Sequence, residues 1–151
     1  MAPGNPHDAA LDWLADAAPD PSGCRSTWAR AGSAVLLLPA GQNWDLLSVP
    51  DGLGLPALDI LRRLPGGGPV LAGHGQVGFL TPVGTASRWF GTGVKVAGDG
   101  LWVAVPHPGR RRHGLRWLVP PDGSGRLVDP ALLELALHDA AARHHLGRPA
   151  D

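Results

Sequence analysis

Several residue types that define common classes of protein are scarce or missing from this chain. It has one cysteine, Cys24, so no internal disulfide can form, and it has no tyrosine and a single lysine, Lys95. Charged residues make up 17% of the chain, below the roughly 25% usual for globular domains. No run of about 20 apolar residues could span a bilayer, and the first residues lack the cationic stretch of a secretory signal. We therefore expect a soluble, cytoplasmic protein.

Apolar residues and turn residues are abundant instead. The chain has 151 residues, of which 44% are hydrophobic, with 22 glycines and 16 prolines. This length and composition predict one compact domain, residues 1–151, built from short elements. The formal net charge of +0 gives no global attraction to nucleic acid or to an anionic membrane, so binding to either must come from a local patch.

The hydrophobic spacing predicts helices near both ends and short strands between them. Apolar residues at helical spacing predict a helix over residues 7–18, and an aspartate cap followed by a proline predicts another over about 130–146. A third helix is expected to begin at Pro56, because proline suits the first turn. Short apolar runs bounded by proline and glycine predict strands at 34–40, 44–50, 93–96, 101–105 and 115–119. The glycine-rich run at 70–80 predicts either one interrupted strand or a hairpin, because its glycines permit a tight reversal. This order predicts an α+β domain with a mostly antiparallel sheet flanked by helices.

Four segments together resemble a known family. They are "SAVLLLPAG", "WDLLSVPDGLGLPALDIL", "VLAGHGQVGFLTPVG" and "GVKVAGDGLWVAVPHPGRRRHGLRWLVPP". In this order they are similar to the prim-pol domain, the bifunctional DNA primase/polymerase family of the archaeo-eukaryotic primase superfamily. The chain is also similar to short prim-pol-like proteins of actinomycetes. The resemblance is clearest over residues 34–121 and implies a primase/polymerase-like fold.

The same resemblance implies that polymerase chemistry has been lost. Prim-pol domains hold their divalent cations with a pair of carboxylates on one strand and a third carboxylate nearby. The alignment places Ser48 and Pro50 at the paired positions and Lys95 at the third, and none of these side chains can hold a cation. The family's phosphate-contacting histidine falls at Gln76, with His74 two residues away. We expect no catalytic residues, no cofactor and no metal.

Other chemical motifs are weak. The seven histidines are scattered and form no HExxH motif, and His144 and His145 are adjacent, so they face different sides of a helix. No GxSxG elbow is present, and Cys24 alone favours an inert, buried thiol. Among the six tryptophans, those at 44, 102 and 117 lie on predicted strands, where large apolar side chains usually face the core. We expect Trp102 and Trp117 on adjacent antiparallel strands, facing the helices.

Two groups of residues are candidate binding sites. The loop "GRRRHG" and the strand after it concentrate positive charge in a neutral chain, and this is either an anion-binding patch or a charged hairpin tip; the residues are Arg110, Arg111, Arg112, His113 and Arg116. The second group is Arg88, Trp89 and Phe90, whose position in a predicted loop favours contact with a partner.

Three functions remain open from the sequence. The first is a catalytically inactive primase/polymerase-like domain that acts as a protein-interaction or regulatory subunit, with an unidentified partner or with a second copy of itself. The second is a weak nucleotide- or nucleic-acid-binding module that uses the arginine loop. The third is an enzyme of unrecognised type.

Overall fold

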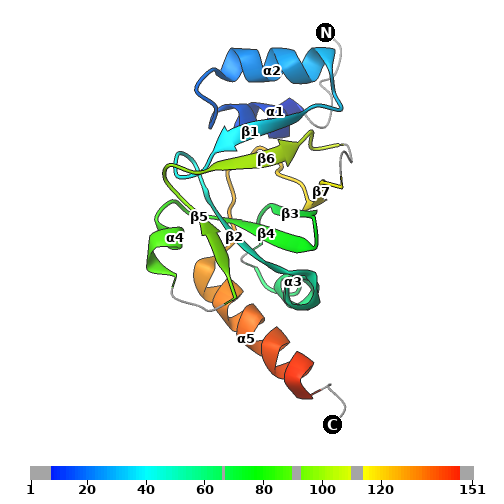
Figure 1. Cartoon of the computed structure of the whole chain (residues 1–151), viewed down its shortest axis with the longest axis vertical. Coiled ribbons are helices and arrows are strands. Elements are labelled where there is room, and N and C mark those ends of the chain that lie inside the picture. Colours follow the sequence, from blue (N-terminus) through cyan, green and yellow to red (C-terminus); the bar gives the residue numbers. More distant parts are fainter. Residues whose placement is uncertain (1–7, 66, 90–92, 110–113, 147–151) are drawn as a thin grey trace.

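The molecule is built in layers around two antiparallel sheets (Figure 1). The computed structural model describes residues 8–65, 67–89, 93–109 and 114–146, with side chains as far as residue 143. Within these ranges, five helices and seven strands form a single compact α+β domain, as the sequence predicts.

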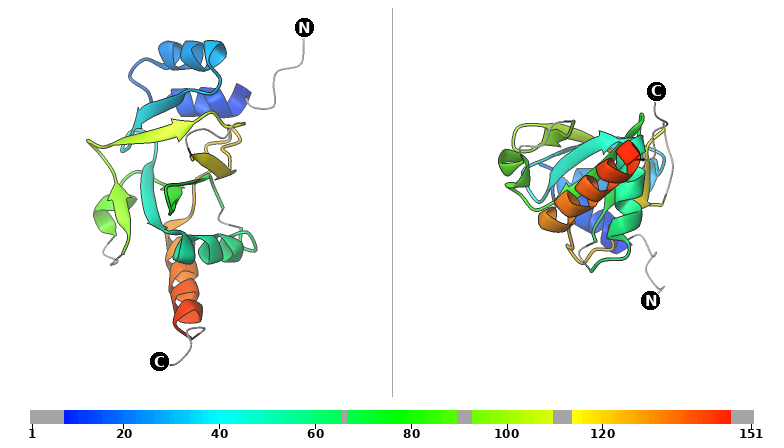
Figure 2. Two further views of the ribbon diagram at one scale, coloured as in Figure 1. Left: turned by 45° about the vertical axis from the view of Figure 1, so that its right-hand side comes forward. Right: turned by 90° about the horizontal axis from the view of Figure 1, so that it is seen from below.

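The smaller sheet is a two-stranded ribbon of β1 and β6, which pair antiparallel. Its strands are β1 (Val35–Pro39) and β6 (Trp102–Pro106), and the helices beside it are α1 (Asp8–Ala15) and α2 (Pro21–Arg30). The views in Figure 2 place α1 and α2 at one end of the molecule, next to this ribbon.

The larger sheet has five strands in the order β5, β2, β4, β3, β7. Its strands are β2 (Asp45–Pro50), β3 (Val70–Gly73), β4 (Gln76–Thr81), β5 (Lys95–Ala97) and β7 (Arg116–Val119). The remaining helices are α3 (Asp51–Leu61), α4 (Thr85–Arg88) and α5 (Pro130–Leu146). The β3–β4 hairpin confirms the tight reversal that the glycines of "VLAGHGQVGFL" predict.

Both faces of the five-stranded sheet are buried. Side chains alternate along a strand, so Leu46 and Leu47 point to opposite faces. Leu46 joins a core shared with the ribbon, α1 and α2, whereas Leu47 joins a core shared with α3 and α5. The sheet is thus the middle layer between the ribbon on one side and two helices on the other.

Two helices begin with the same Asp-Pro pair. The Asp129 carboxylate accepts a hydrogen bond from the Ala131 N–H at 2.9 Å, and the Asp20 carboxylate accepts one from the Gly23 N–H at 3.0 Å. In each helix the proline follows the cap and needs no N–H partner in the first turn.

The predicted helix at 130–146 is confirmed. Helix α2 is absent from the sequence-based prediction, because the prolines and glycine of residues 18–23 indicate only the end of the first helix.

The start of α3 corrects a second prediction. The helix begins at Asp51 and carries Pro56 in its interior, five residues later than its first position. Gly54 explains how this helix lies so close to the sheet, because a Cβ at that position would come within 2.5 Å of the Val77 side chain. The close packing of α3 on β4 holds the helix in place around its proline.

The predicted role of one tryptophan is wrong. Trp44 is fully buried, as expected, and Trp117 is half-buried against the core between the two sheets. Trp102, however, is 55% exposed. It lies on β6 in the ribbon whereas Trp117 lies on β7 in the larger sheet, so the two residues are not on adjacent strands. The register of β6 turns Trp102 away from the core and Val103 into it.

Candidate functional site

The positions at which the sequence-based resemblance predicts lost metal ligands lie together on one face of the larger sheet. Ser48 on β2 is paired with Lys95 on β5 and with Gly78 on β4, and Pro50 is paired with Gln76. Paired residues of antiparallel strands share a face, so these side chains lie on the face that also carries Leu46. The arrangement brings an amine, a hydroxyl and an amide together, and no carboxylate is among them.

The nearest carboxylate on β2 has a structural task. Asp45 is 2% exposed and points to the opposite face from Leu46. Its Oδ2 accepts hydrogen bonds at 2.9 Å from the backbone N–H groups of Gly84 and Ala86. A buried carboxylate needs such partners, and these two donors fix the turn that begins α4. Nothing in the sequence around Asp45 signals this role, because its donors are about 40 residues away.

The described part of the chain contains no group of three histidine, cysteine, aspartate or glutamate side chains placed to hold a metal ion. Cys24 is buried in the core beside α1, and burial raises the pKa of its thiol. A thiol that stays protonated is a poor nucleophile and a poor metal ligand.

Arg116 lies beside a hollow on the other face of the larger sheet. The hollow has a volume of about 270 Å³ and is lined by Arg116, the β3–β4 turn and the first turns of α3. Arg116 is paired with Ala72, one residue along from the pair of Trp117 with Leu71, so it faces α3 whereas Trp117 faces the ribbon. The sheet therefore separates Arg116 from Ser48 and Lys95.

The turn next to Arg116 has an unusual backbone. His74 has a φ of 55°, a left-handed conformation that non-glycine residues seldom adopt, and Gly75 follows with a φ of 78°. The Gly75 carbonyl accepts a hydrogen bond from the Asp51 N–H at 2.9 Å, which joins this turn to the start of α3. Among the described residues, the lining of the hollow includes one arginine, one histidine and one aspartate. Residues Arg110, Arg111, Arg112 and His113 lie outside the described residues.

The second predicted site is divided by the structure. Arg88 is exposed at the end of α4, whereas Trp89 is half-buried and packs against the core formed with α3 and α5. The indole Nε1 of Trp89 is buried and has no hydrogen-bond partner among the described residues. Phe90 lies outside the described residues. Much of the Trp89 surface is therefore already used inside the domain.

Two large exposed apolar side chains lie on one face of the ribbon. The register pairs Leu37 with Ala104, Pro39 with Trp102, and Val35 with Pro106, so these six side chains share one face and all are apolar. Leu37 is 63% exposed and Trp102 is 55% exposed, while Leu101 beside them is 51% exposed. We call the six paired residues the ribbon face. In the described structure each ribbon strand pairs on one side only, so each has one edge without a strand partner.

Comparisons with protein families, with curated proteins and with solved structures found no match to this chain. None of the described helices combines the length and the apolar character that crossing a membrane requires.

Proposed function

We propose that this chain is a catalytically inactive primase/polymerase-like domain that acts as a protein-interaction or regulatory subunit, and that it binds its partner through the ribbon face. The observation that carries this proposal is the exposure of Leu37 and Trp102 on a face with no polar side chain. Large exposed apolar patches mark interaction sites in soluble proteins, and tryptophan is enriched among the residues that dominate interfaces.

The open edges of the ribbon add a second means of binding. An unpaired strand edge presents backbone N–H and C=O groups that an incoming strand can match. A partner that adds a strand beside β1 or β6 would gain these hydrogen bonds together with contact to the ribbon face. Such a partner is either a different protein or a second copy of this chain.

The test compares two leucines of equal exposure. Leu37 on the ribbon is 63% exposed and Leu135 on α5 is 64% exposed. Affinity capture from the native cell, with mass spectrometry, is carried out with the parent, with Leu37→Ser combined with Trp102→Ser, and with Leu135→Ser. We expect the double variant alone to lose the partner that the parent captures.

Light scattering during gel filtration covers the case in which the partner is a second copy. The parent would then be dimeric, the double variant monomeric and Leu135→Ser dimeric. If the ribbon variant and the parent capture the same proteins and have the same mass in solution, the ribbon face is not the binding surface.

Loss of catalysis is tested separately. Because Ser48, Pro50 and Lys95 offer no carboxylate, the purified protein should not extend a primer. Ser48→Asp combined with Pro50→Asp should leave it inactive, because the ammonium group of Lys95 would still occupy the third position and repel a divalent cation. Template-dependent nucleotide incorporation by the parent, above that of a heat-inactivated sample, would contradict the proposal.

A weaker nucleotide- or nucleic-acid-binding function is a second candidate, supported by the hollow beside Arg116. Guanidinium groups bind phosphates, and Gly114, which follows the loop containing Arg110, Arg111 and Arg112, lines this hollow.

To test this candidate, labelled single- and double-stranded DNA is titrated into the parent, into Arg116→Gln and into a triple alanine variant of the loop, at two salt concentrations. If these arginines bind phosphates, both variants should bind more weakly and with a flatter salt dependence, by up to about one unit of log–log slope for each phosphate group that is no longer bound. Equal binding by all three proteins would rule out this candidate.

A further inference from the structure

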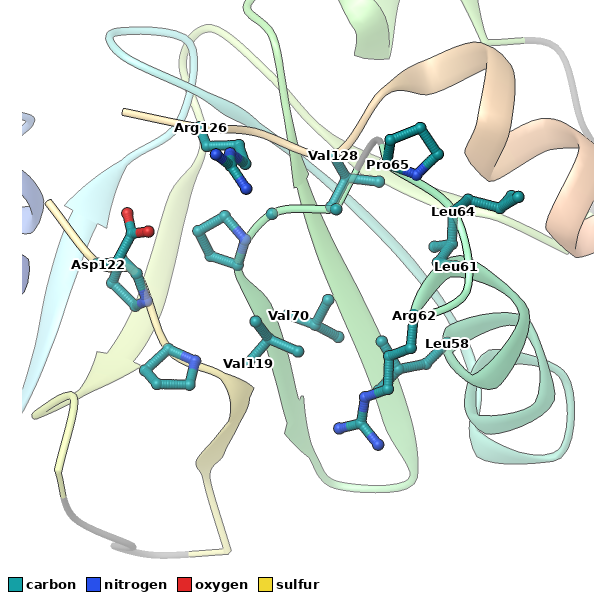
Figure 3. Close-up of a pocket in the computed structure, with 15 residues that line it drawn as sticks. Leu58, Leu61, Arg62, Leu64, Pro65, Val70, Val119, Asp122, Arg126 and Val128 are labelled. Carbon is teal, nitrogen blue, oxygen red and sulfur yellow. The ribbon is translucent and has the colours of Figure 1, made fainter. Parts of the chain in front are cut away.

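A separate hollow lies between the C-terminal end of α3 and the segment that follows β7 (Figure 3). Its volume is about 280 Å³, the space of roughly nine water molecules. Val70 and Val119 form its centre, and leucines of α3 and a group of prolines surround them. This hollow is distinct from the ribbon face and from the hollow beside Arg116, because none of its lining residues belongs to either.

The walls of this hollow are held firmly. The Leu80 N–H donates to the Pro69 carbonyl at 3.1 Å, and the Val128 N–H donates to the Leu80 carbonyl at 2.8 Å. Gly68 lets the chain cross directly against residues 127 and 128, since a Cβ there would come within 2.5 Å of their backbone. The prolines have no N–H to satisfy and limited backbone freedom. The hollow therefore exists before any ligand arrives, which lowers the entropic cost of binding.

The lining combines an apolar interior with charged groups at its edge. Leu64, Pro65, Val119 and Pro120 supply accessible apolar surface over a floor of buried residues, Leu58, Leu61, Val70 and Val128, and no aromatic side chain is among the lining residues. Figure 3 shows the guanidinium groups of two arginines on different sides of the two central valines. A ligand that fits this lining has an aliphatic body and carries negative charge.

The charges of this edge do not cancel. Hydrogen bonds from Ser124 hold the pKa of the Asp122 carboxyl below its usual range, so it is ionised at neutral pH. The edge therefore carries one carboxylate and two guanidinium groups, those of Arg62 and Arg126. Arg62 forms no ion pair with a carboxylate in the described part of the chain. Its guanidinium donates a long hydrogen bond of 3.5 Å to the Leu118 carbonyl, which directs the side chain across from α3 toward β7.

We propose that this hollow binds a small aliphatic carboxylate, with its hydrocarbon chain against Val119 and Pro120 and its carboxylate on the guanidinium of Arg62. Arginine presents two parallel N–H groups that match the two oxygens of a carboxylate. The hydrocarbon chain gains free energy by leaving water for the leucine, valine and proline surface. The volume is at the lower end of the range for ligand pockets, so the chain is short.

The test uses sodium octanoate as the probe and two-dimensional NMR of the isotope-labelled full chain as the readout. Octanoate should bind saturably and shift the backbone amide signals of Val70 and Val119. Octan-1-ol has the chain without the charge, and acetate has the charge without the chain. Each should bind at least about tenfold more weakly, because each lacks one of the two contributions.

Two variants and one matched control locate the site. Arg62→Gln should weaken octanoate binding about tenfold by removing the charged hydrogen bonds. Arg63→Gln changes the neighbouring exposed arginine, which does not line the hollow, and should leave the affinity unchanged. Gly67→Leu should block binding, because Gly67 lines the hollow and has no heavy atom within 4 Å of the position of a Cβ. Thermal melts check that all three variants are folded.

Several results would overturn the proposal. The first is an absence of octanoate binding up to about 10 mM, a concentration far above a useful affinity for a small ligand. The second is equal binding of octanoate and octan-1-ol. The third is an equal loss of affinity in Arg62→Gln and Arg63→Gln. A short apolar peptide with a free carboxyl terminus is titrated in parallel. If it binds and octanoate does not, the hollow takes a protein terminus and the proposal of a small carboxylate is wrong.

Discussion

The five-stranded sheet and the two-stranded ribbon solve the problem of covering apolar strands in different ways. The larger sheet has a core on each face, so every apolar side chain at its centre is enclosed. The ribbon has a core on the face of Leu38 and Val103 only, and its other face carries Leu37 and Trp102 in the open. The same apolar composition therefore stabilises the fold in one sheet and offers a binding surface in the other.

The largest expected difference between the two sheets is in the stability lost when a tryptophan of each is replaced by alanine. Trp44→Ala should lower the free energy of unfolding by about 3–5 kcal/mol, because it leaves a cavity in a closed core. Trp102→Ala should change it by about 0.5 kcal/mol or less, as at other exposed positions. Urea unfolding followed by circular dichroism measures both. Equal decreases in stability would mean that the ribbon face is covered within the domain.

The second prediction concerns Asp45, the buried carboxylate of the five-stranded sheet. Asp45→Ala should cost about 2–4 kcal/mol, since the N–H groups of Gly84 and Ala86 would be left without an acceptor in a buried place. Asp59→Ala, on the exposed side of α3, serves as the control and should have little effect. The same urea titrations give both values, and a cost for Asp45→Ala no larger than that for Asp59→Ala would show that the turn before α4 does not need the carboxylate.

The smallest expected effect is a pH dependence of stability caused by Cys24, which is buried in the core on the covered side of the ribbon. Burial raises the pKa of its thiol in the folded protein, so the folded state keeps a proton that the unfolded state loses. The free energy of unfolding should therefore decrease as the pH rises above about 8.5, the ordinary pKa of a thiol, toward the higher folded value. Comparison with Cys24→Ala over this range isolates the contribution. Rapid alkylation of the native thiol at pH 8 would show that α2 does not shield it.

The sequence predicts the class of the fold and most of its elements, and the misses have physical causes. The Asp-Pro pair at 129–130 precedes a long apolar run and so indicates a helix, whereas the same pair at 20–21 precedes a polar segment and gives no such signal. The face of Trp102 could not be predicted, because residues 101–105 are all apolar and show no alternation. Only the pairing with β1 decides which side of β6 meets the core.

The candidate sites depend on long-range pairing, which is why the sequence locates them incompletely. The resemblance to prim-pol domains predicts that Ser48, Pro50 and Lys95 replace metal-binding carboxylates and that Gln76 replaces a histidine, and strand pairing brings these four residues together. It does not reveal that Arg116 faces α3, because this depends on the register between β3 and β7. The hollow around Val70 and Val119 joins segments that are far apart in the chain, so no local motif signals it.

The exposed indole of Trp102 makes this protein convenient for optical spectroscopy. The chain has no tyrosine, so its near-ultraviolet emission comes from six indoles, all within the described ranges, of which Trp102 is the only exposed one. Iodide, which cannot enter a packed core, should quench the long-wavelength part of the emission and leave the signal of Trp44. A partner that covers the ribbon face should shift that part of the spectrum to shorter wavelength and protect it from iodide, so docking can be followed without any label.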